Sequence, residues 1–234
     1  MSKKILIYTE GKGDRNFLGW YLNFLKCQDH FDMLDIEGKD KLISGEFPEK
    51  IRKILNNEHQ TYKQVCIIFD ADKKESQESD AGFDNKLEHI REKFKEKRID
   101  FPREQIFLFP NNQDDGDLET LLLKIANHKE FINCFEGYLD CIKKTEHYKP
   151  PIKDIRKNML YAYLEVFGLE KFFQYTWDTE KKNNEKKLII DDKDGGEIEI
   201  KDQYKKDYKK LTEVIDFDSK SLIPLKNFKA ICRK

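Results

Sequence analysis

Short hydrophobic runs alternate with longer amphipathic segments in the first half of the chain. The short runs occupy residues 5–8, 31–36, 65–69 and 106–109, and their length and flanking turn residues predict β-strands. Hydrophobic residues recur at helical spacing over 17–25, 47–55 and 84–97, and again after Asp117. Strands that alternate with helices predict βαβ units, so we expect an α/β fold with a parallel sheet flanked by helices.

The pattern changes after residue 126, where helical spacing dominates. We expect helices over 128–143 and 152–167, a β-hairpin of 188–190 with 197–200 around a turn at 194–196, a loop over 181–187, and a closing helix over 219–231. We therefore divide the chain into an α/β domain over residues 1–126 and a C-terminal helical and β-hairpin elaboration over 127–234, packed on that domain.

Two smaller patterns in the second half allow two interpretations each. Lysines alternate with Tyr204 and Tyr208 over 201–210, which fits either a nucleic-acid surface or a solvated helix face with its tyrosines packed inward. We favour the packed helix. Cys134 and Cys141 are seven residues apart on one predicted helix face, and we expect core positions for them rather than redox chemistry.

Composition narrows the functional classes. The chain has 234 residues, with 44 Lys and Arg against 45 Asp and Glu, so bulk positive charge cannot carry nucleic-acid binding. Its 17 Phe, 10 Tyr and 2 Trp exclude a disordered chain. No apolar run approaches the roughly 18 residues of a membrane span, and the N-terminal run is too short for a signal peptide. Five cysteines without a CxxC pair indicate reduced thiols in a cytoplasmic protein, and the scattered histidines argue against zinc.

Acidic residues follow three of the four predicted strands. They are Glu10 after the first strand, Asp70 and Asp72 after the third, and Asp114, Asp115, Asp117 and Glu119 after the fourth. The carboxyl ends of parallel strands share one edge of a sheet, and ligands bind there, so we expect these side chains to lie together. If the backbone stays extended, Asp70 and Asp72 point the same way. The alternative is ordinary loop acids, and Asp117 also suits a helix N-cap.

Clustered carboxylates at this edge would favour a bound cation. Two like charges about 5 Å apart repel by about 3 kcal/mol at an effective dielectric of 20. Oxygen ligands without His or Cys suit Mg²⁺ or Mn²⁺. Lys12, Arg15 and Lys73 lie in the same predicted turns and would bind substrate phosphates.

Two of these motifs resemble the Toprim domain of topoisomerases, bacterial primases and OLD-type nucleases. They are Glu10-Gly11-Lys12-Gly13-Asp14 and Asp70-Ala71-Asp72, and each follows an apolar strand. Small stand-alone Toprim-like proteins, which resemble the chain most, also carry a loop like 110–119. The resemblance covers about residues 3–126. It implies that Glu10 is a general acid/base or metal ligand, that Asp70 and Asp72 bind Mg²⁺, and that Asp115, Asp117 or Glu119 completes a second metal site.

The resemblance implies metal-dependent phosphodiester chemistry on DNA or RNA, with a Mg²⁺-dependent nuclease as the preferred function. Lys74 stands where many members have a third Asp, which argues against topoisomerase-like strand passage. One alternative is a non-catalytic module that binds nucleic acid or protein. Another is a small-molecule phosphatase, because residues 67–72 also resemble the nucleophile strand of haloacid-dehalogenase phosphatases. A protein partner is possible but not identifiable from the sequence.

Overall fold

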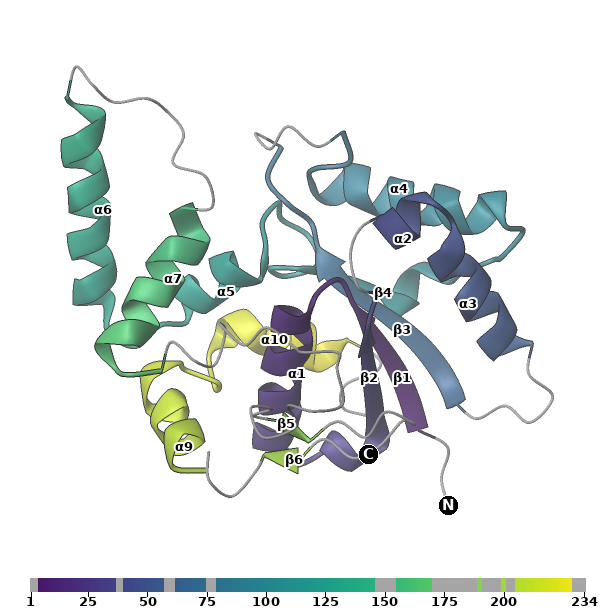
Figure 1. Ribbon diagram of the computed structural model, residues 1–234, viewed down its shortest axis with the longest axis horizontal. Coiled ribbons are helices and arrows are strands. Elements are labelled where there is room, and N and C mark those ends of the chain that lie inside the picture. The colour runs from purple at the N-terminus through teal and green to yellow at the C-terminus, as the bar shows by residue number, and fades with distance from the viewer. Residues whose placement is uncertain are drawn as a thin grey trace, which may run out of the picture.

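Four parallel strands form the centre of the protein. The computed structural model describes residues 4–36, 40–56, 62–74, 79–145, 155–169, 189–190, 199–200 and 205–228. The strands are β1 (Lys4–Thr9), β2 (Phe31–Asp35), β3 (Tyr62–Asp70) and β4 (Ile106–Phe109), in the spatial order β2-β1-β3-β4 (Figure 1). Every pairing in this sheet is parallel. The predicted α/β fold with a parallel sheet flanked by helices is confirmed.

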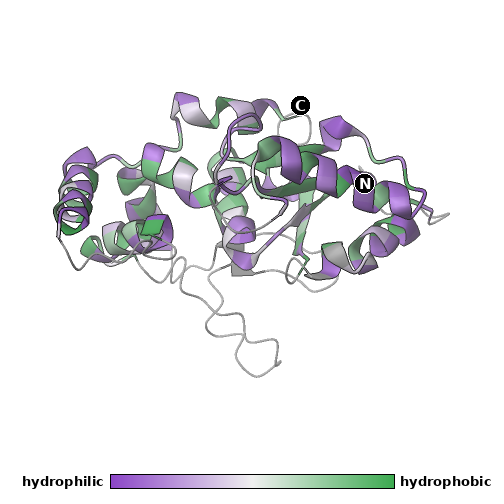
Figure 2. Cartoon of the chain, turned by 90° about the horizontal axis from the view of Figure 1, so that it is seen from above, coloured by the Kyte–Doolittle hydropathy of each residue, from purple (hydrophilic) through white to green (hydrophobic). Residues whose placement is uncertain are grey.

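Helices bury both faces of the sheet, which explains why its strands are hydrophobic throughout (Figure 2). On one face α1 (Lys12–Phe24) packs with alternate strand residues such as Ile5 and Ile7. On the other face Leu6 and Tyr8 pack with three helices. These helices are α2 (Asp40–Ile43), α3 (Glu46–Leu55) and α4 (Phe83–Glu96). The period-2 alternation of strand side chains thus assigns each residue to one of two hydrophobic cores.

The strand order creates a switch point between β1 and β3. From β1 the chain passes through α1 to β2, and from β3 it passes through α4 to β4, on the opposite face and in the opposite direction. Crossover connections between parallel strands are right-handed, so two connections that run in opposite directions along the sheet must lie on opposite faces. In open α/β sheets, the crevice outside the strand ends at such a point is the usual ligand site.

The C-terminal elements extend the core on the α1 face. These elements are α5 (Leu118–Lys124), α6 (Lys129–Lys143), α7 (Ile155–Val166), α9 (Lys205–Val214), the 3₁₀ turn η5 (Lys220–Leu222) and α10 (Ile223–Asn227). In the first half of the chain, the 3₁₀ turns η1 (Gln28–His30) and η2 (Arg103–Gln105) directly precede β2 and β4. Helix α7 packs between α5 and α6 (Figure 1). Leu121, Leu160 and Val214 belong to the same hydrophobic core as Ile7, so packing is continuous across residue 126.

Several local predictions for the second half can be compared with the structure. Strands β5 (Ile189–Ile190) and β6 (Glu199–Ile200) pair antiparallel, as predicted, while the turn at 194–196 and the loop at 181–187 lie outside the described residues. The Tyr208 hydroxyl donates to the Trp20 carbonyl at 3.0 Å, which confirms inward packing for this tyrosine. Tyr204 lies outside the described residues.

Helix α6 differs from expectation in the environment of its cysteines. Cys134 and Cys141 are exposed, so their predicted core positions are wrong. The helix lies at the edge of the molecule and packs on α7, so it buries only one narrow stripe (Figure 1). Across the described part of the chain, no helix is both long and apolar enough to cross a membrane.

Candidate functional site

Four carboxylates meet at the switch point, and we call Glu10, Asp14, Asp70 and Glu119 the acidic cluster. Glu10 follows Thr9, whose register partner on β3 is Ile68, two residues before Asp70. Adjacent strand ends therefore bring Glu10 and Asp70 together, although 60 positions separate them in the numbering of the chain.

Helix α1 and helix α5 contribute the other two members of the cluster. Asp14 lies in the first turn of α1, and its carboxylate accepts a hydrogen bond from the Gly11 amide at 2.9 Å. Asp70 Oδ1 accepts one from the Leu118 amide at 2.9 Å, which ties the end of β3 to the start of α5. Glu119 is the next residue of that helix and so comes within reach of Asp70.

The acidic cluster is electrostatically strained. Burial, followed by the charges of Asp14, Glu10 and Glu119, raises the pKa of Asp70 well above its ordinary value. Burial and the Glu10 charge raise the pKa of Asp14, and burial and the Asp117 charge raise the pKa of Glu119. Carboxyls with raised pKa values either hold protons or are stabilised in their charged form when a cation binds beside them.

Asp72 has a different partner from Asp70. Its backbone has a φ of 59°, so the extended conformation on which a common direction of the two carboxylates depends is absent there. Asp72 Oδ2 pairs with Lys86 Nζ at 2.9 Å, and the same ammonium pairs with Asp80 at 2.8 Å. The Lys86 side chain is 2% exposed. Burial alone would lower the pKa of Lys86, but Glu10, Asp72 and Asp80 raise it overall.

The loop acids after β4 are engaged in structural contacts. Asp115 accepts a hydrogen bond from the Phe83 amide at 2.7 Å and lies 3.8 Å from Lys74. Asp117 caps α5, accepting from the Thr120 amide at 2.8 Å, as its N-cap interpretation predicts. Its second oxygen accepts from Arg156 Nε at 3.0 Å, and despite burial, this arginine holds the pKa of Asp117 below its ordinary value. Exposed Asp114 accepts from the Asn111 side chain.

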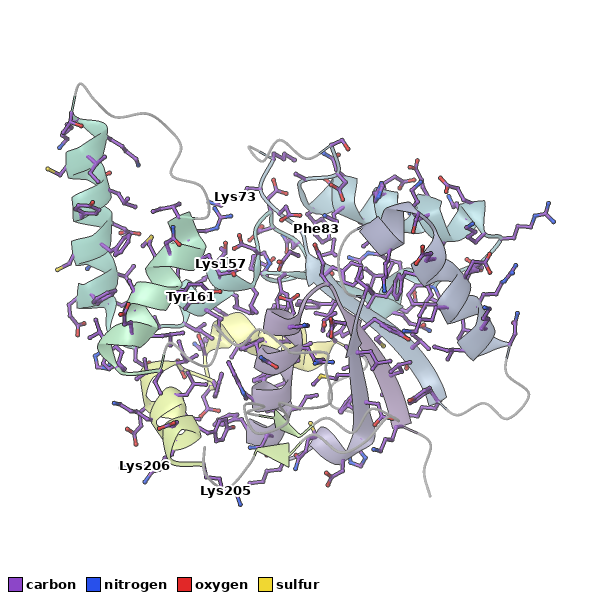
Figure 3. The ribbon with its side chains drawn as sticks, in the orientation of Figure 1. Lys73, Phe83, Lys157, Tyr161, Lys205 and Lys206 are labelled. Atoms are coloured by element: carbon purple, nitrogen blue, oxygen red, sulfur yellow. The ribbon has the colours of Figure 1, made fainter. Side chains whose placement is uncertain are left out.

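The three predicted phosphate-binding residues have different environments: Arg15 forms a buried ion pair, while Lys12 and Lys73 lie in the segments that follow two strands. Arg15 is buried and pairs with Asp35 of β2 at 3.0 Å, so its guanidinium faces the protein interior. Lys12 begins α1 directly after Gly11, and Lys73 lies in the segment after β3. Lys157 of α7 is exposed, and its charge partly offsets the rise that burial and neighbouring acids cause in the pKa of Asp14 and of Glu119. Lys73 and Lys157 lie on the side of the molecule where the strands end (Figure 3).

The donor set of the acidic cluster fits partial coordination of a hard cation. No group of three or more His, Cys, Asp or Glu side chains within the described ranges is arranged to hold a metal ion. Glu10, Asp70 and Asp72 therefore do not form a three-ligand group, and their metal roles stay predictions. Protein sites bind Mg²⁺ through one or two carboxylates completed by water and substrate phosphates. Oxygen donors with raised pKa values suit that arrangement.

Comparison with known proteins places this geometry in a family. The family model described as "Protein of unknown function (DUF3226)" matches residues 3–171. The chain belongs to the DUF3226 family. The match includes α5, α6 and α7, so the family segment extends beyond the α/β domain predicted for residues 1–126.

One solved structure that resembles this DUF3226 chain is the C-terminal region of the Burkholderia pseudomallei OLD protein. The likeness has a TM-score of 0.39 and 12% sequence identity, and it covers 74% of this chain and 86% of that one. A likeness this distant carries no argument about function. The comparison with curated proteins found no match.

Sequence reasoning missed several charged residues of the site in this DUF3226 chain. One is Asp14, whose place in the motif of residues 10–14 is the signal that could have found it. Lys86 precedes Ile90 and Phe94 by four and eight positions, so it lies on the buried face of α4. A lysine on the buried face of a helix indicates a buried charge that needs acidic partners. Arg156 and Lys157 gave no comparable signal, because their place beside α5 depends on how α7 packs.

Proposed function

We propose that this DUF3226 chain is a Toprim-like enzyme that cleaves phosphodiester bonds in nucleic acid with the help of Mg²⁺ or Mn²⁺. The observation that supports this proposal is the acidic cluster at the switch point. Three of its carboxyls, those of Asp14, Asp70 and Glu119, have raised pKa values. Carboxyls with raised pKa values that gather at the ligand-binding edge of a sheet are typical of a functional site.

Asp70 and Glu10 are the residues we assign to the cation, with Asp14 beside them. When bound, the ion would neutralise phosphate oxygens and stabilise the leaving oxygen. The Leu118 amide donates a hydrogen bond to Asp70 Oδ1, which holds the carboxylate at the beginning of α5. Glu10 lies at the end of the adjacent strand and takes the proton from the attacking water, a role worth roughly 10²–10⁴-fold in rate.

Lysines at the border of the acidic cluster would bind the substrate backbone. Lys157 is exposed and lies within electrostatic range of Asp14 and Glu119. Lys12 and Lys73 come from the segments that follow β1 and β3. Phosphates bound by these residues would complete the coordination of a cation that the protein holds through few ligands. Arg15 has a structural role in this proposal because it pairs with Asp35.

One observation favours a second function, a module that binds nucleic acid without cutting it. Asp72, Asp115 and Asp117 each pair with a cationic side chain of the protein, so fewer carboxylates remain for catalysis than the sequence indicated. Such a module would bind nucleic acid through the same lysines and release it unchanged.

A cleavage assay tests the proposal. Single- and double-stranded DNA and RNA are incubated with the protein in Mg²⁺, in Mn²⁺ and in EDTA, beside a chromogenic phosphate monoester. We expect metal-dependent cleavage of at least one nucleic acid, lost in Asp70→Asn and strongly reduced in Glu10→Gln. Asp100→Asn, an exposed acid outside the acidic cluster, is the matched control and should cleave normally. Equal cleavage by Asp70→Asn contradicts the proposal, and turnover of the monoester alone favours a phosphatase.

A further inference from the structure

Lys86 is a lysine in a place where lysines are rare. Its side chain is 2% exposed, and its ammonium lies 2.8 Å from Asp80 and 2.9 Å from Asp72. A buried ammonium is tolerated only where carboxylates compensate its charge. Here two carboxylates contact one buried ammonium, whereas a surface ion pair usually joins one carboxylate to one cation.

The same ammonium also faces the acidic cluster. Burial alone would lower the pKa of Lys86, and the Glu10 charge acts together with Asp72 and Asp80 to raise it. Lys86 thus contacts the segment that follows β3 and lies within electrostatic range of the end of β1. Asp72 adopts a φ of 59° and its carbonyl accepts a hydrogen bond from the Gly116 amide at 2.9 Å, which ties the segment after β3 to the loop before α5.

Two of the three carboxylates expected to complete a second metal site, those of Asp115 and Asp117, also have partners within the protein, whereas Glu119 belongs to the acidic cluster. Asp117 pairs with Arg156, and Asp115 holds the Phe83 amide and lies near Lys74. Asp70 contrasts with them, because its carboxylate accepts a hydrogen bond from a backbone amide and its surrounding charges are acidic. The site thus contains carboxylates in contact with cations of the protein, those of Asp72, Asp115 and Asp117, beside Asp70, whose surrounding charges are acidic.

We propose that the Lys86 ammonium takes the place of a second metal ion, so that the site binds a single divalent cation beside Asp70. This inference rests on the proposed function for that one cation. In two-metal sites the ions lie about 3.5–4 Å apart and share carboxylates. Here a fixed positive charge already occupies the carboxylates of Asp72 and Asp80. Because it is buried, Lys86 acts as a positioning residue and does not contact substrate.

Mn²⁺ binding stoichiometry tests the proposal. The metal-free protein is titrated with Mn²⁺ by isothermal calorimetry, and free Mn²⁺ is followed by electron paramagnetic resonance. We expect one ion per wild-type chain, two in Lys86→Met, and one in Lys86→Arg, which keeps the charge. Lys95→Met removes an exposed lysine of the same helix and should leave one. Circular dichroism checks the fold of each variant, and two ions in the wild type overturn the proposal even if Lys86→Met does not fold.

The outcomes separate this inference from the proposed function. If the wild type binds no ion and Lys86→Met binds one, Lys86 does replace a metal while the metal-dependent function fails. If both bind one, the metal site stands and the role of Lys86 is wrong. If neither binds any, both are wrong.

Discussion

The Leu118 amide donates a hydrogen bond to Asp70 Oδ1 at 2.9 Å, and this contact joins two segments 48 residues apart. It connects the end of β3 to the beginning of α5 and so brings Glu119 to Asp70. The hydrogen bond favours the charged form of the Asp70 carboxyl, while the neighbouring acids disfavour it. Both the stability and the metal response of the protein should therefore depend on Asp70.

Asp70→Asn should stabilise the metal-free protein. The amide oxygen can still accept from Leu118, while the charge repelled by Asp14 and Glu10 is removed. We expect Tm to rise by about 2–4 °C, the shift that corresponds to roughly 1 kcal/mol in a chain of this size. Differential scanning fluorimetry in EDTA measures the rise, with Asp100→Asn as the control. A lower Tm for Asp70→Asn would show that its carboxylate is structural.

Added metal should reverse that ranking. At a hundredfold excess over Kd, a cation that binds only the folded chain stabilises it by about 2.7 kcal/mol. Wild type and Asp100→Asn should show this gain with Mg²⁺ or Mn²⁺, and Asp70→Asn should not. Melting curves with and without metal give the comparison. A wild-type curve that does not move at saturating metal contradicts a cation site here.

The advantage of Asp70→Asn should grow with pH. Between the ordinary carboxyl pKa of about 4 and the raised pKa of Asp70, the folded wild type holds a proton that the unfolded chain has released. The free energy of unfolding of the wild type therefore falls, relative to the variant, as pH rises through that window. Urea unfolding of both proteins, without metal and from about pH 4 to pH 8, measures the difference. A gap that stays constant with pH would be inconsistent with the raised pKa.

The Arg156–Asp117 pair should couple α7 to α5. Arg156 donates through Nε at 3.0 and 3.1 Å and through a second nitrogen, and both side chains are partly buried. Arg156→Met leaves Asp117 without this partner, while Asp117→Asn preserves the helix cap. A double-mutant cycle by urea unfolding should give a coupling energy of about 1–2 kcal/mol. Additive effects of the two changes would mean that the pair contributes nothing to stability.

Lys157→Ala should weaken nucleic-acid binding without changing the fold. The side chain is exposed, so its loss removes a phosphate contact rather than a core contact. We expect lower affinity and a slope of log K against log salt that is shallower by about 1. Fluorescence anisotropy at several salt concentrations measures both. Lys206→Ala, on α9 and distant from Lys157 in Figure 3, should bind as the wild type does, and a shared loss would indicate bulk charge alone.

Local sequence patterns predicted the strands, the main helices and the edge of the sheet at which acids gather. They did so because the periodicity of a strand or a helix is a property of residues close together in the sequence. In addition, the carboxyl ends of parallel strands lie at one edge of the sheet. Glu10 and Asp70 could be placed together on that argument alone. The sequence also contained a sign of Lys86, a charged residue in line with Ile90 and Phe94.

The pairing of each acid depended on contacts between distant segments. Asp72 leaves the extended conformation and meets Lys86, and Asp117 meets Arg156 from a helix 39 residues further along the chain. Spacing within a motif contains no information about such partners, because they are set by how α4 and α7 pack on the sheet. The carboxylates at this edge look equivalent in the sequence, and packing divides them into those in contact with cations of the protein, such as Asp72 and Asp117, and those surrounded by other acids, such as Asp70.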